Sequence, residues 1–282
     1  MAEGNWWADE VNLSQTAWNV SAAVLQTPAM RGEHLTLAQR SGFIPTLNRP
    51  REASEFGFNM WVLGCDPTDG SIPATRTLRR QVFDQNLNTL LRVFSQDQRL
   101  IRFKFENASG NRVADGLVTD VIQLTTMMAR QRGEFSATFN VPDVYWRDET
   151  IGSTASAANA TLPKDLPLTH LVGGTAPVDD ALVSVVGPIT NPRVTDLETG
   201  IWVQYTGTLT SAQTWTVDSS AFTSVVNGTS VRSATSHGGH PRFLYIPPRY
   251  GNTNTPTVRL TGSAGGTTTK LTVTSYRKHL LP

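Results

Sequence analysis

The sequence predicts a mainly β protein of two domains, and three observations carry this prediction. Short runs of alternating apolar and polar residues recur along most of the 282 residues. One segment, residues 76–95, instead repeats its apolar residues at a helical period. Composition changes sharply after Glu149, where a stretch of small residues separates a mixed first half from a Thr-, Val- and Gly-rich second half. The length also lies near the limit of about 250–300 residues at which a single core stops growing.

Residues 1–149 are predicted to form a β domain. The clearest strand covers residues 56–63, where Phe56, Phe58, Met60 and Val62 alternate with Gly57, Asn59, Trp61 and Leu63. Because both faces carry apolar residues, we expect protein on each side of this sheet. Further strands are expected over residues 18–25, 33–38, 100–105, 113–124 and 132–145, and Pro142 indicates that the last of these ends there or lies at a sheet edge.

One helix is expected to flank this sheet. Its apolar residues fall at spacings of three, four and one, which places them on one stripe. They are Leu78, Val82, Phe83, Leu87, Leu90, Leu91 and Phe94. Polar residues such as Arg80, Asp84 and Arg92 fill the rest of the surface. Since a buried large apolar side chain contributes about 1.5–3 kcal/mol, this stripe is expected to form a major part of the domain core.

The second half is predicted to be an antiparallel β sandwich or jelly roll over residues 168–282. Residues 150–167 contain small side chains and prolines, and are expected to be a linker or an exposed loop. The runs after them are short, alternating and separated by Gly, Pro and Asn turns, as in sandwich folds. They cover residues 181–186, 200–205, 214–217, 243–246, 257–260 and 270–276.

Charge and composition exclude several classes of function. A net charge of +1 gives no electrostatic reason to bind nucleic acid or anionic membranes. The lone Cys65 cannot form an intramolecular disulfide and is expected to be buried. The N-terminal residues show no basic segment followed by an apolar one, so we expect no signal peptide. We therefore expect that the protein is synthesised in a cytoplasm. No apolar stretch approaches 18 residues, so we expect no membrane insertion.

No residue is predicted to be catalytic, to bind a cofactor or to ligate a metal, and the chain is not expected to be an enzyme. His237 and His240 form a pair on a Gly-rich loop, but lack Cys or carboxylate partners at a ligand spacing. The acidic doublets at residues 9–10, 148–149 and 179–180 are expected to be solvated turns. Phosphate-loop, nucleophile-elbow and zinc-protease motifs are absent from the sequence. Trp202, Tyr205 and Trp215 could stack on sugars, although on sandwich strands they are more often core residues.

The order of these weak motifs resembles the distal tail proteins of long-tailed, non-contractile bacteriophages, over nearly the whole chain. In the first half the resemblance rests on the Arg31-Gly32-Glu33 turn, the strand from Phe56 to Gly64, and the helix holding Asn86, Leu87, Leu90 and Leu91. In the second half it rests on residues 174–177, 187–192, 200–207, 215–218 and 243–248.

The resemblance implies a tail-tube-like N-terminal β barrel or sandwich and a galectin-like C-terminal sandwich. It also implies a hexameric ring in the virion, at the phage tail tip, between the tail-tube protein and the tail-tip hub. Tape-measure protein and DNA would pass through the lumen of this ring. Receptor-binding proteins and host glycans are further candidate partners, although residues 168–282 leave no room for the long insertions with which some family members bind sugars.

Other functions remain open from the sequence. A carbohydrate-binding module would use the C-terminal sandwich, with Trp202 or Trp215 exposed. An enzyme fragment with an active site between subunits is a third class. Within the structural class, a tail-tube or other minor tail protein is the nearest alternative, but a tube protein usually needs only the first domain.

Overall fold

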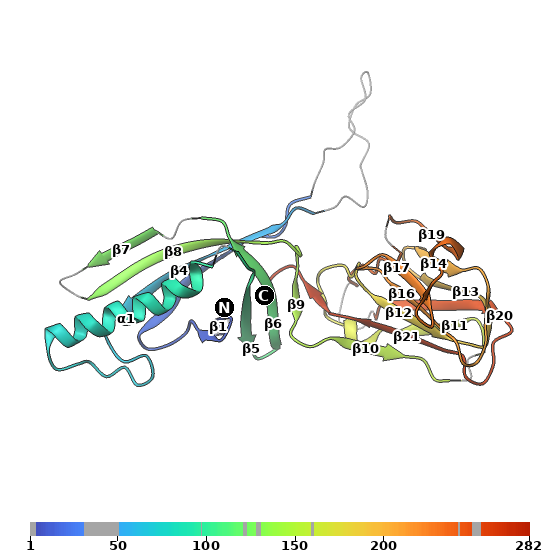
Figure 1. Cartoon of the computed structure of the whole chain (residues 1–282), viewed down its shortest axis with the longest axis horizontal. Coiled ribbons are helices and arrows are strands. Elements are labelled where there is room, and N and C mark those ends of the chain that lie inside the picture. The colour runs from blue at the N-terminus through green and yellow to red at the C-terminus, as the bar shows by residue number, and fades with distance from the viewer. Residues whose placement is uncertain are drawn as a thin grey trace, which may run out of the picture. The chain divides into compact units, whose positions relative to one another are not determined.

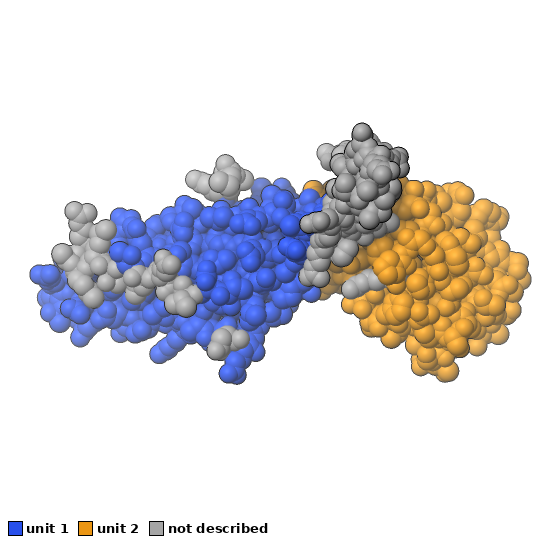
Figure 2. Space-filling model, turned by 90° about the horizontal axis from the view of Figure 1, so that it is seen from above, with its two compact units in different colours: residues 1–149, 280–282 blue, residues 150–279 orange. Residues whose placement is uncertain are grey.

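The computed structural model describes residues 4–30, 51–96, 98–120, 123–127, 131–158, 161–241, 243–249 and 255–282. The chain divides into two compact units, residues 1–149 with 280–282 and residues 150–279. Figure 2 colours them blue and orange, and we call them unit 1 and unit 2. The C-terminal residues, which the sequence assigned to the second domain, belong to unit 1. There, Arg112 Nη1 donates a hydrogen bond to the carbonyl of Leu281 (3.0 Å).

Unit 1 is a curved antiparallel sheet with one helix, as Figure 1 shows. Its strands follow the order β2-β1-β5-β6-β8-β4-β3, and β7 pairs with β8 and β9 with β6. The strands are β1 (Asn5–Ala8), β2 (Val11–Asn12), β3 (Trp18–Leu25), β4 (Ser54–Leu63), β5 (Ile101–Asn107), β6 (Gly110–Val118), β7 (Gln123–Met127), β8 (Arg132–Val141) and β9 (Trp146–Asp148). The prediction of a mainly β chain with one α-helix in its first half is confirmed for the described residues.

The alternation of β4 fixes which face of the sheet is buried. Phe56, Phe58, Met60 and Val62 are buried, and the facing residues of β8 are buried with them. Phe103 of β5 packs on Phe139 of β8, with ring centroids 4.5 Å apart. This aromatic core explains why β4 and β8 keep a ten-residue register, because a slip of one residue would turn every core side chain outward.

Helix α1 (Arg76–Phe94) lies against β4 and β8, where the apolar stripe predicted it. Thr75 caps its N-terminus, since its Oγ1 accepts a hydrogen bond from the Leu78 amide (3.3 Å). Phe83, Leu90 and Phe94 are buried. Leu78 is 49% exposed, so the prediction that it belongs to the buried stripe is wrong. At about 100° per residue, Leu78 lies about 120° around the helix from Leu90, outside the buried face.

A close approach at Gly64 allows this packing. A Cβ on Gly64 would lie 2.5 Å from the carbonyl oxygen of Arg79, so a larger residue would push the first turns of α1 off the sheet.

Predicted boundaries elsewhere in unit 1 need small corrections. The strand expected over residues 113–124 ends at Val118, and β8 ends at Val141, before Pro142. Residues 33–38 lie outside the described residues.

Unit 2 consists of two six-stranded sheets around a separate apolar core. One sheet has the order β10-β21-β12-β16-β17-β18, and the other β11-β20-β13-β14-β19, with β15 paired to β13. The strands are β10 (Gly152–Ala155), β11 (Lys164–Pro167), β12 (Leu182–Val186), β13 (Ile189–Asp196), β14 (Trp202–Tyr205), β15 (Thr208–Leu209), β16 (Thr214–Asp218), β17 (Thr223–Val226), β18 (Thr229–Ser230), β19 (Thr235–Gly238), β20 (Thr257–Ser263) and β21 (Lys270–Ser275). The short strand β22 (Lys278–His279) belongs to neither of these sheets. Two short 3-10 helices, η1 (Thr169–Leu171) and η2 (Arg232–Ala234), complete it.

The segment predicted to be a linker, residues 150–167, instead supplies a strand to each sheet of unit 2. β10 pairs with β21 and β11 with β20, and Leu166 is buried in the core. Its small and polar residues suit edge strands, because an edge strand can bury a single side chain such as Leu166 and expose the rest.

The prediction of a strand over residues 243–246 is also wrong. Phe243 and Leu244 are buried in a loop, and Ile246 makes an isolated bridge with Val178.

Candidate assembly surfaces

Residues that a metal site would need do not converge in the described part of the chain. There, no group of three or more His, Cys, Asp or Glu side chains could hold a metal ion. His237 Nδ1 lies 3.2 Å from the carbonyl of His240, so this pair closes its own loop. Lys278 Nζ lies 2.9 Å from carboxylate oxygens of both Asp179 and Asp180, so both aspartates form ion pairs with this lysine.

Two other titratable groups are held in uncharged forms. Burial, helped by the nearby charge of Asp66, raises the pKa of the Cys65 thiol above its usual value, so Cys65 is a buried apolar residue as predicted. Burial lowers the pKa of His170 below its ordinary value of 6.5. Its ring bridges two strands, with Nδ1 2.6 Å from Thr154 Oγ1 on β10 and Nε2 3.2 Å from Ser275 Oγ on β21. Both groups therefore serve packing.

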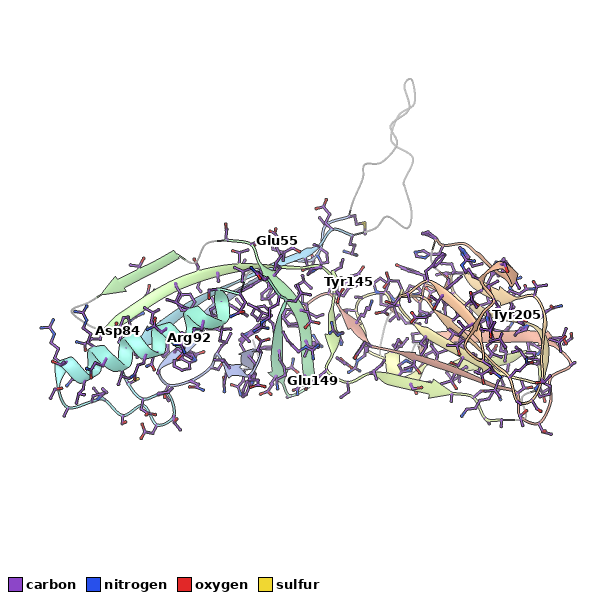
Figure 3. All side chains as sticks on the ribbon, in the orientation of Figure 1. Glu55, Asp84, Arg92, Tyr145, Glu149 and Tyr205 are labelled. Atoms are coloured by element: carbon purple, nitrogen blue, oxygen red, sulfur yellow. The ribbon has the colours of Figure 1, made fainter. Side chains whose placement is uncertain are left out.

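The aromatic residues considered for sugar stacking are occupied within unit 2. Trp215 is buried, and its Nε1 donates to Ser224 Oγ (2.8 Å). Tyr205, labelled in Figure 3, packs 6.0 Å from Trp215 between ring centroids. Trp202 is half-buried beneath the Arg193 guanidinium, whose Cζ lies 4.1 Å from the ring centroid. Trp215 is thus a core residue, and Arg193 occupies a face of the Trp202 ring that a sugar would need.

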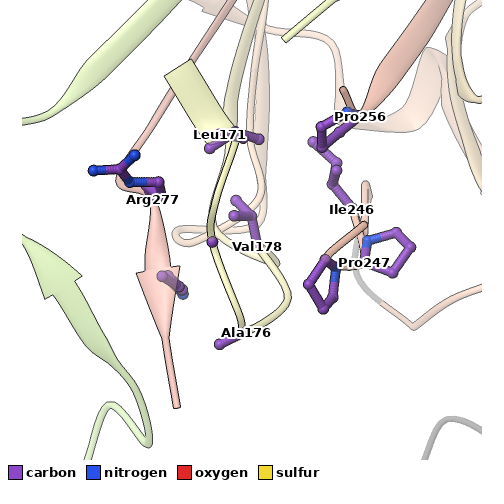
Figure 4. Close-up of a pocket in the computed structure, with 10 residues that line it drawn as sticks. Leu171, Ala176, Val178, Ile246, Pro247, Pro256 and Arg277 are labelled. Atoms are coloured by element: carbon purple, nitrogen blue, oxygen red, sulfur yellow. The ribbon is translucent and has the colours of Figure 1, made fainter. Parts of the chain in front are cut away.

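The small cavity of unit 2 drawn in Figure 4 offers no ligand site. It measures about 10 Å³ and is lined largely by apolar side chains that include Leu171, Val178 and Ile246. A volume of this size holds at most one water molecule. Among the described residues of either unit, none of the helices is long and apolar enough to cross a membrane.

The face of the β4–β8 sheet that α1 does not cover is mostly polar. We call it the open face, and define it by residues 55, 57, 59, 61 and 63 of β4 and residues 134, 136, 138 and 140 of β8. Asn59 and Glu134 are exposed on it, Ser136 and Thr138 are half-buried, and shallow hollows lie between the two strands. Only Trp61 and Leu63 are apolar here, and both are half-buried. The expectation of protein cover on this face stays a prediction, since Trp61 and Leu63 are only half-buried within the single chain.

A network of ion pairs links β5, β6 and β9 of unit 1. Asp115 accepts hydrogen bonds from Arg102 Nε (3.0 Å) and Arg147 Nη2 (2.6 Å). Burial alone would raise the pKa of Asp115, but the two guanidinium groups outweigh burial and hold it below its ordinary value. Because these charges neutralise one another inside one subunit, this surface is less suited to a charged partner.

Two surfaces at opposite ends of β4 combine exposed apolar side chains with charge. The first, which we call the arginine end, lies where α1 begins. Ile72 is 67% exposed and Leu78 49%, and the exposed Arg76 and Arg80 flank them. Arg80 makes only a long contact with Asp84 (4.0 Å), and α1 carries four arginines against this one aspartate.

The second surface, which we call the glutamate end, lies at the start of β4. Val24, which pairs with Gly57 of β4, is 52% exposed, and Met30, which bridges Arg51, is 54% exposed, so the two lie six residues apart along the chain. The carboxylates of Glu52 and Glu55 are also exposed here. The glutamates border a hollow of about 390 Å³, and no described residue lies within ion-pair distance of either. Figure 3 shows Glu55 toward one end of the sheet and Asp84 of α1 toward the other.

Sequence reasoning missed these two surfaces. It placed Leu78 in the buried stripe because Leu78 is four residues before Val82, although Leu78 lies about 120° around the helix from Leu90. Ile72 offered a usable signal, since it is a large apolar residue in an otherwise polar loop. Val24 and Met30 offered none, because apolar residues at the end of a strand are ordinary core residues in most sheets.

Comparison with known proteins identifies this architecture. No family model matches the sequence, and no curated protein matches it either. Among solved structures, the Dit protein of phage SPP1, described as a paradigm of the hub adsorption apparatus in phages that infect Gram-positive bacteria, matches over 98% of this chain and 99% of its own. The TM-score is 0.59 and the sequence identity 16%.

This chain has the Dit fold. The likeness covers both units, so the resemblance to distal tail proteins is confirmed at the level of fold. Two chains from the phage P2 baseplate in its activated conformation, with Ca and with Sr, match with TM-scores of 0.36 and 0.35 at 8% and 9% identity. They cover 97% and 96% of this chain and 98% of their own. Scores this low carry no argument about this protein.

Proposed function

We propose that this chain is a structural subunit of a phage tail tip and works without enzymatic activity. The single observation that carries the proposal is the Dit fold, which extends over both units. Unit 1 forms a closed ring of six copies that joins the tail tube to the tail-tip hub. Unit 2 lies outside the ring. The protein is made in the host cytoplasm and acts in the virion.

The open face of unit 1 lines the lumen in this proposal. Tape-measure protein and DNA must pass through the ring without binding to its wall. An apolar wall would bind them, because apolar surface would be buried in the contact. The side chains of Asn59, Ser136 and Thr138 are polar and uncharged, and Glu134 is paired with Arg132 (2.6 Å). Such a wall neither binds apolar protein nor holds phosphate groups by charge.

Negative-stain images of the purified full-length protein test the proposal. We expect ring-shaped particles with six-fold symmetry and a central opening, and light scattering should give the mass of six chains. Because rings can dissociate on dilution, the protein is also mixed with its tail-tube and hub partners. Compact particles without an opening in both preparations would contradict the proposal, and so would turnover of host-wall polymer by the purified chain.

A further inference from the structure

We infer that unit 2 binds the carboxylate or phosphate group of an anionic saccharide on the outer face of strands β13 and β14. The site consists of Arg193, Trp202, Gln204, Ser236 and Thr261, which we call the Trp202 platform. The inference goes beyond the proposed function and rests on unit 2 alone. It can therefore fail while the ring assembles, and it can hold if the ring does not.

The strand register brings these five side chains to one face of a sheet. Buried and half-buried residues alternate along β13 and β14, and Arg193, Trp202 and Gln204 lie on the half-buried side, away from the core. Arg193 pairs with Gln204 on one side and with Thr261 on the other, and Gln204 pairs with Ser236. Because opposite residues of neighbouring strands hold their Cβ atoms about 5 Å apart, one small ligand can contact several of them.

Trp202 holds the guanidinium of Arg193 in place. The Cζ atom of Arg193 lies 4.1 Å from the ring centroid, which is typical of a cation–π contact. The ring in turn covers Gly238 of β19, where an added Cβ would lie 2.7 Å from Trp202 Nε1. Since the ring already restrains the guanidinium, Arg193 loses little conformational entropy when a ligand binds.

No carboxylate neutralises Arg193 in the described part of the chain, where none lies within ion-pair distance of it. Asp165, on the same face of the sheet, accepts two hydrogen bonds from Arg259 instead (2.6 and 2.8 Å). The side chains of Gln204 and Ser236 form no hydrogen bonds with other described residues. The platform therefore offers one cation together with uncharged donors, which suits an anion that also carries hydroxyl groups.

The surroundings favour a saccharide over a protein as the carrier of this anion. A guanidinium binds carboxylate or phosphate oxygens through parallel N–H donors. Protein interfaces also need apolar anchors, but none of the large apolar side chains that are exposed among the described residues lies on β13, β14, β19 or β20. Because Arg193 covers a face of the Trp202 ring, the sugar is held by its charged group rather than by stacking.

Nuclear magnetic resonance titration of the isotopically labelled full-length protein tests the site. The indole N–H signal of Trp202, assigned with Trp202→Phe, is the reporter, and ionic strength is kept constant. We expect glucuronate, glucose phosphate or both to shift this signal saturably, with a Kd of about 1–10 mM, because one charged pair supplies only modest affinity. Methyl glucoside, which is neutral, should cause no shift. Comparison of the two charged sugars tells which oxyanion the site prefers.

Two variants separate Arg193 from the general charge of the face. Arg193→Gln removes the cation and should weaken binding at least about tenfold, since the charge-assisted hydrogen bonds supply most of the affinity. A double variant, Asp165→Asn with Arg259→Gln, removes a charge pair from the same face and should leave the affinity unchanged. If Arg193→Gln lowers the thermal midpoint, Arg193→Lys replaces it. This variant keeps the charge but lacks the fork of donors, so it should also weaken binding.

The inference is wrong if neither charged sugar shifts the Trp202 signal, or if both Arg193 variants bind as tightly as wild type. Equal affinity for acetate or inorganic phosphate alone would exclude a saccharide as the ligand. Tighter binding of a glutamate-rich peptide would also overturn the inference, in favour of a protein partner. None of these results bears on ring formation, which the negative-stain images test separately.

Discussion

Asn86 is a polar residue buried within the apolar face of α1, and it fixes the helix to the end of β4. Its Nδ2 donates to the carbonyls of Leu63 and Cys65, both at 2.9 Å. These carbonyls flank Gly64, where the strand ends and the helix comes closest. The amide therefore satisfies backbone groups that the end of the sheet leaves buried.

We expect Asn86→Ala to lower the free energy of unfolding of unit 1 by about 1–3 kcal/mol, because it leaves two buried carbonyls without donors. Urea denaturation followed by Trp fluorescence measures the change. Asn88→Ala, on the exposed face of the same helix, is the matched control and should change stability little. Equal effects of the two substitutions would show that the carbonyls find water instead.

The titration of His170 is expected to make the stability of unit 2 depend on pH. Its pKa in the folded chain lies below the ordinary value of 6.5, so the unfolded chain binds this proton first as pH falls. The stability that depends on neutral His170 is therefore complete above about pH 7 and is lost as pH falls through 6.5 toward the folded-state pKa. We expect the urea midpoint of unit 2 to drop between pH 7.5 and 5.5, and to drop less in His170→Gln. Parallel pH profiles of the two proteins would contradict this prediction.

At the scale of elements, α1 supplies the cover that the β4–β8 sheet needs on its core face. Leu90 is fully buried, whereas Leu87 is only partly buried, so the two positions of the predicted stripe should not be equally sensitive. We expect Leu90→Asp to unfold unit 1 or lower its thermal midpoint severely, because the carboxylate loses hydration without a partner. Arg92→Ala, two residues away and exposed, should cost little. A thermal midpoint that Leu90→Asp leaves unchanged would mean that α1 is not packed on the sheet.

The corrected role of residues 150–167 gives a second prediction at this scale. Leu166 of β11 is buried in the core of unit 2, while Ile151 in the same segment is exposed. We expect Leu166→Asp to lower the thermal midpoint of unit 2 strongly, and Ile151→Asp to leave it nearly unchanged. If both substitutions were neutral, the segment would behave as the linker that its composition suggests.

At the scale of the whole molecule, the two units have separate cores. The buried residues of one cluster all lie between Trp6 and Trp146, and those of the other between Leu166 and Val273. We therefore expect substitutions in one core to change one calorimetric transition and leave the other in place. Trp215→Ala, which should cost about 3–5 kcal/mol, should lower only the transition of unit 2. Leu90→Asp should act only on the other, and a shared shift would show that the units unfold together.

The sequence alone determined the mainly β class, the position of the helix and the inward faces of β4 and β8. These features follow from periodicity, since each side chain of a strand or helix points in a direction that its spacing sets. Gly64 and Asn86 show where periodicity ends. The close approach of α1 at Gly64 and the two carbonyls that Asn86 binds depend on contacts between segments far apart in the chain.

The sequence predicted no catalytic or metal-binding residues and therefore no site. The exposed surfaces could be identified only from the tertiary structure. Only the fold shows that Ile72, Leu78, Val24 and Met30 are exposed. Only the fold showed that the face opposite Phe56 is polar, because Asn59 of β4 meets Ser136 of β8 there. Likewise, residues 150–167 read as a linker because an edge strand needs few apolar residues. Local sequence specifies the direction of a side chain, but the neighbours that cover it are chosen by pairings between segments far apart in the chain.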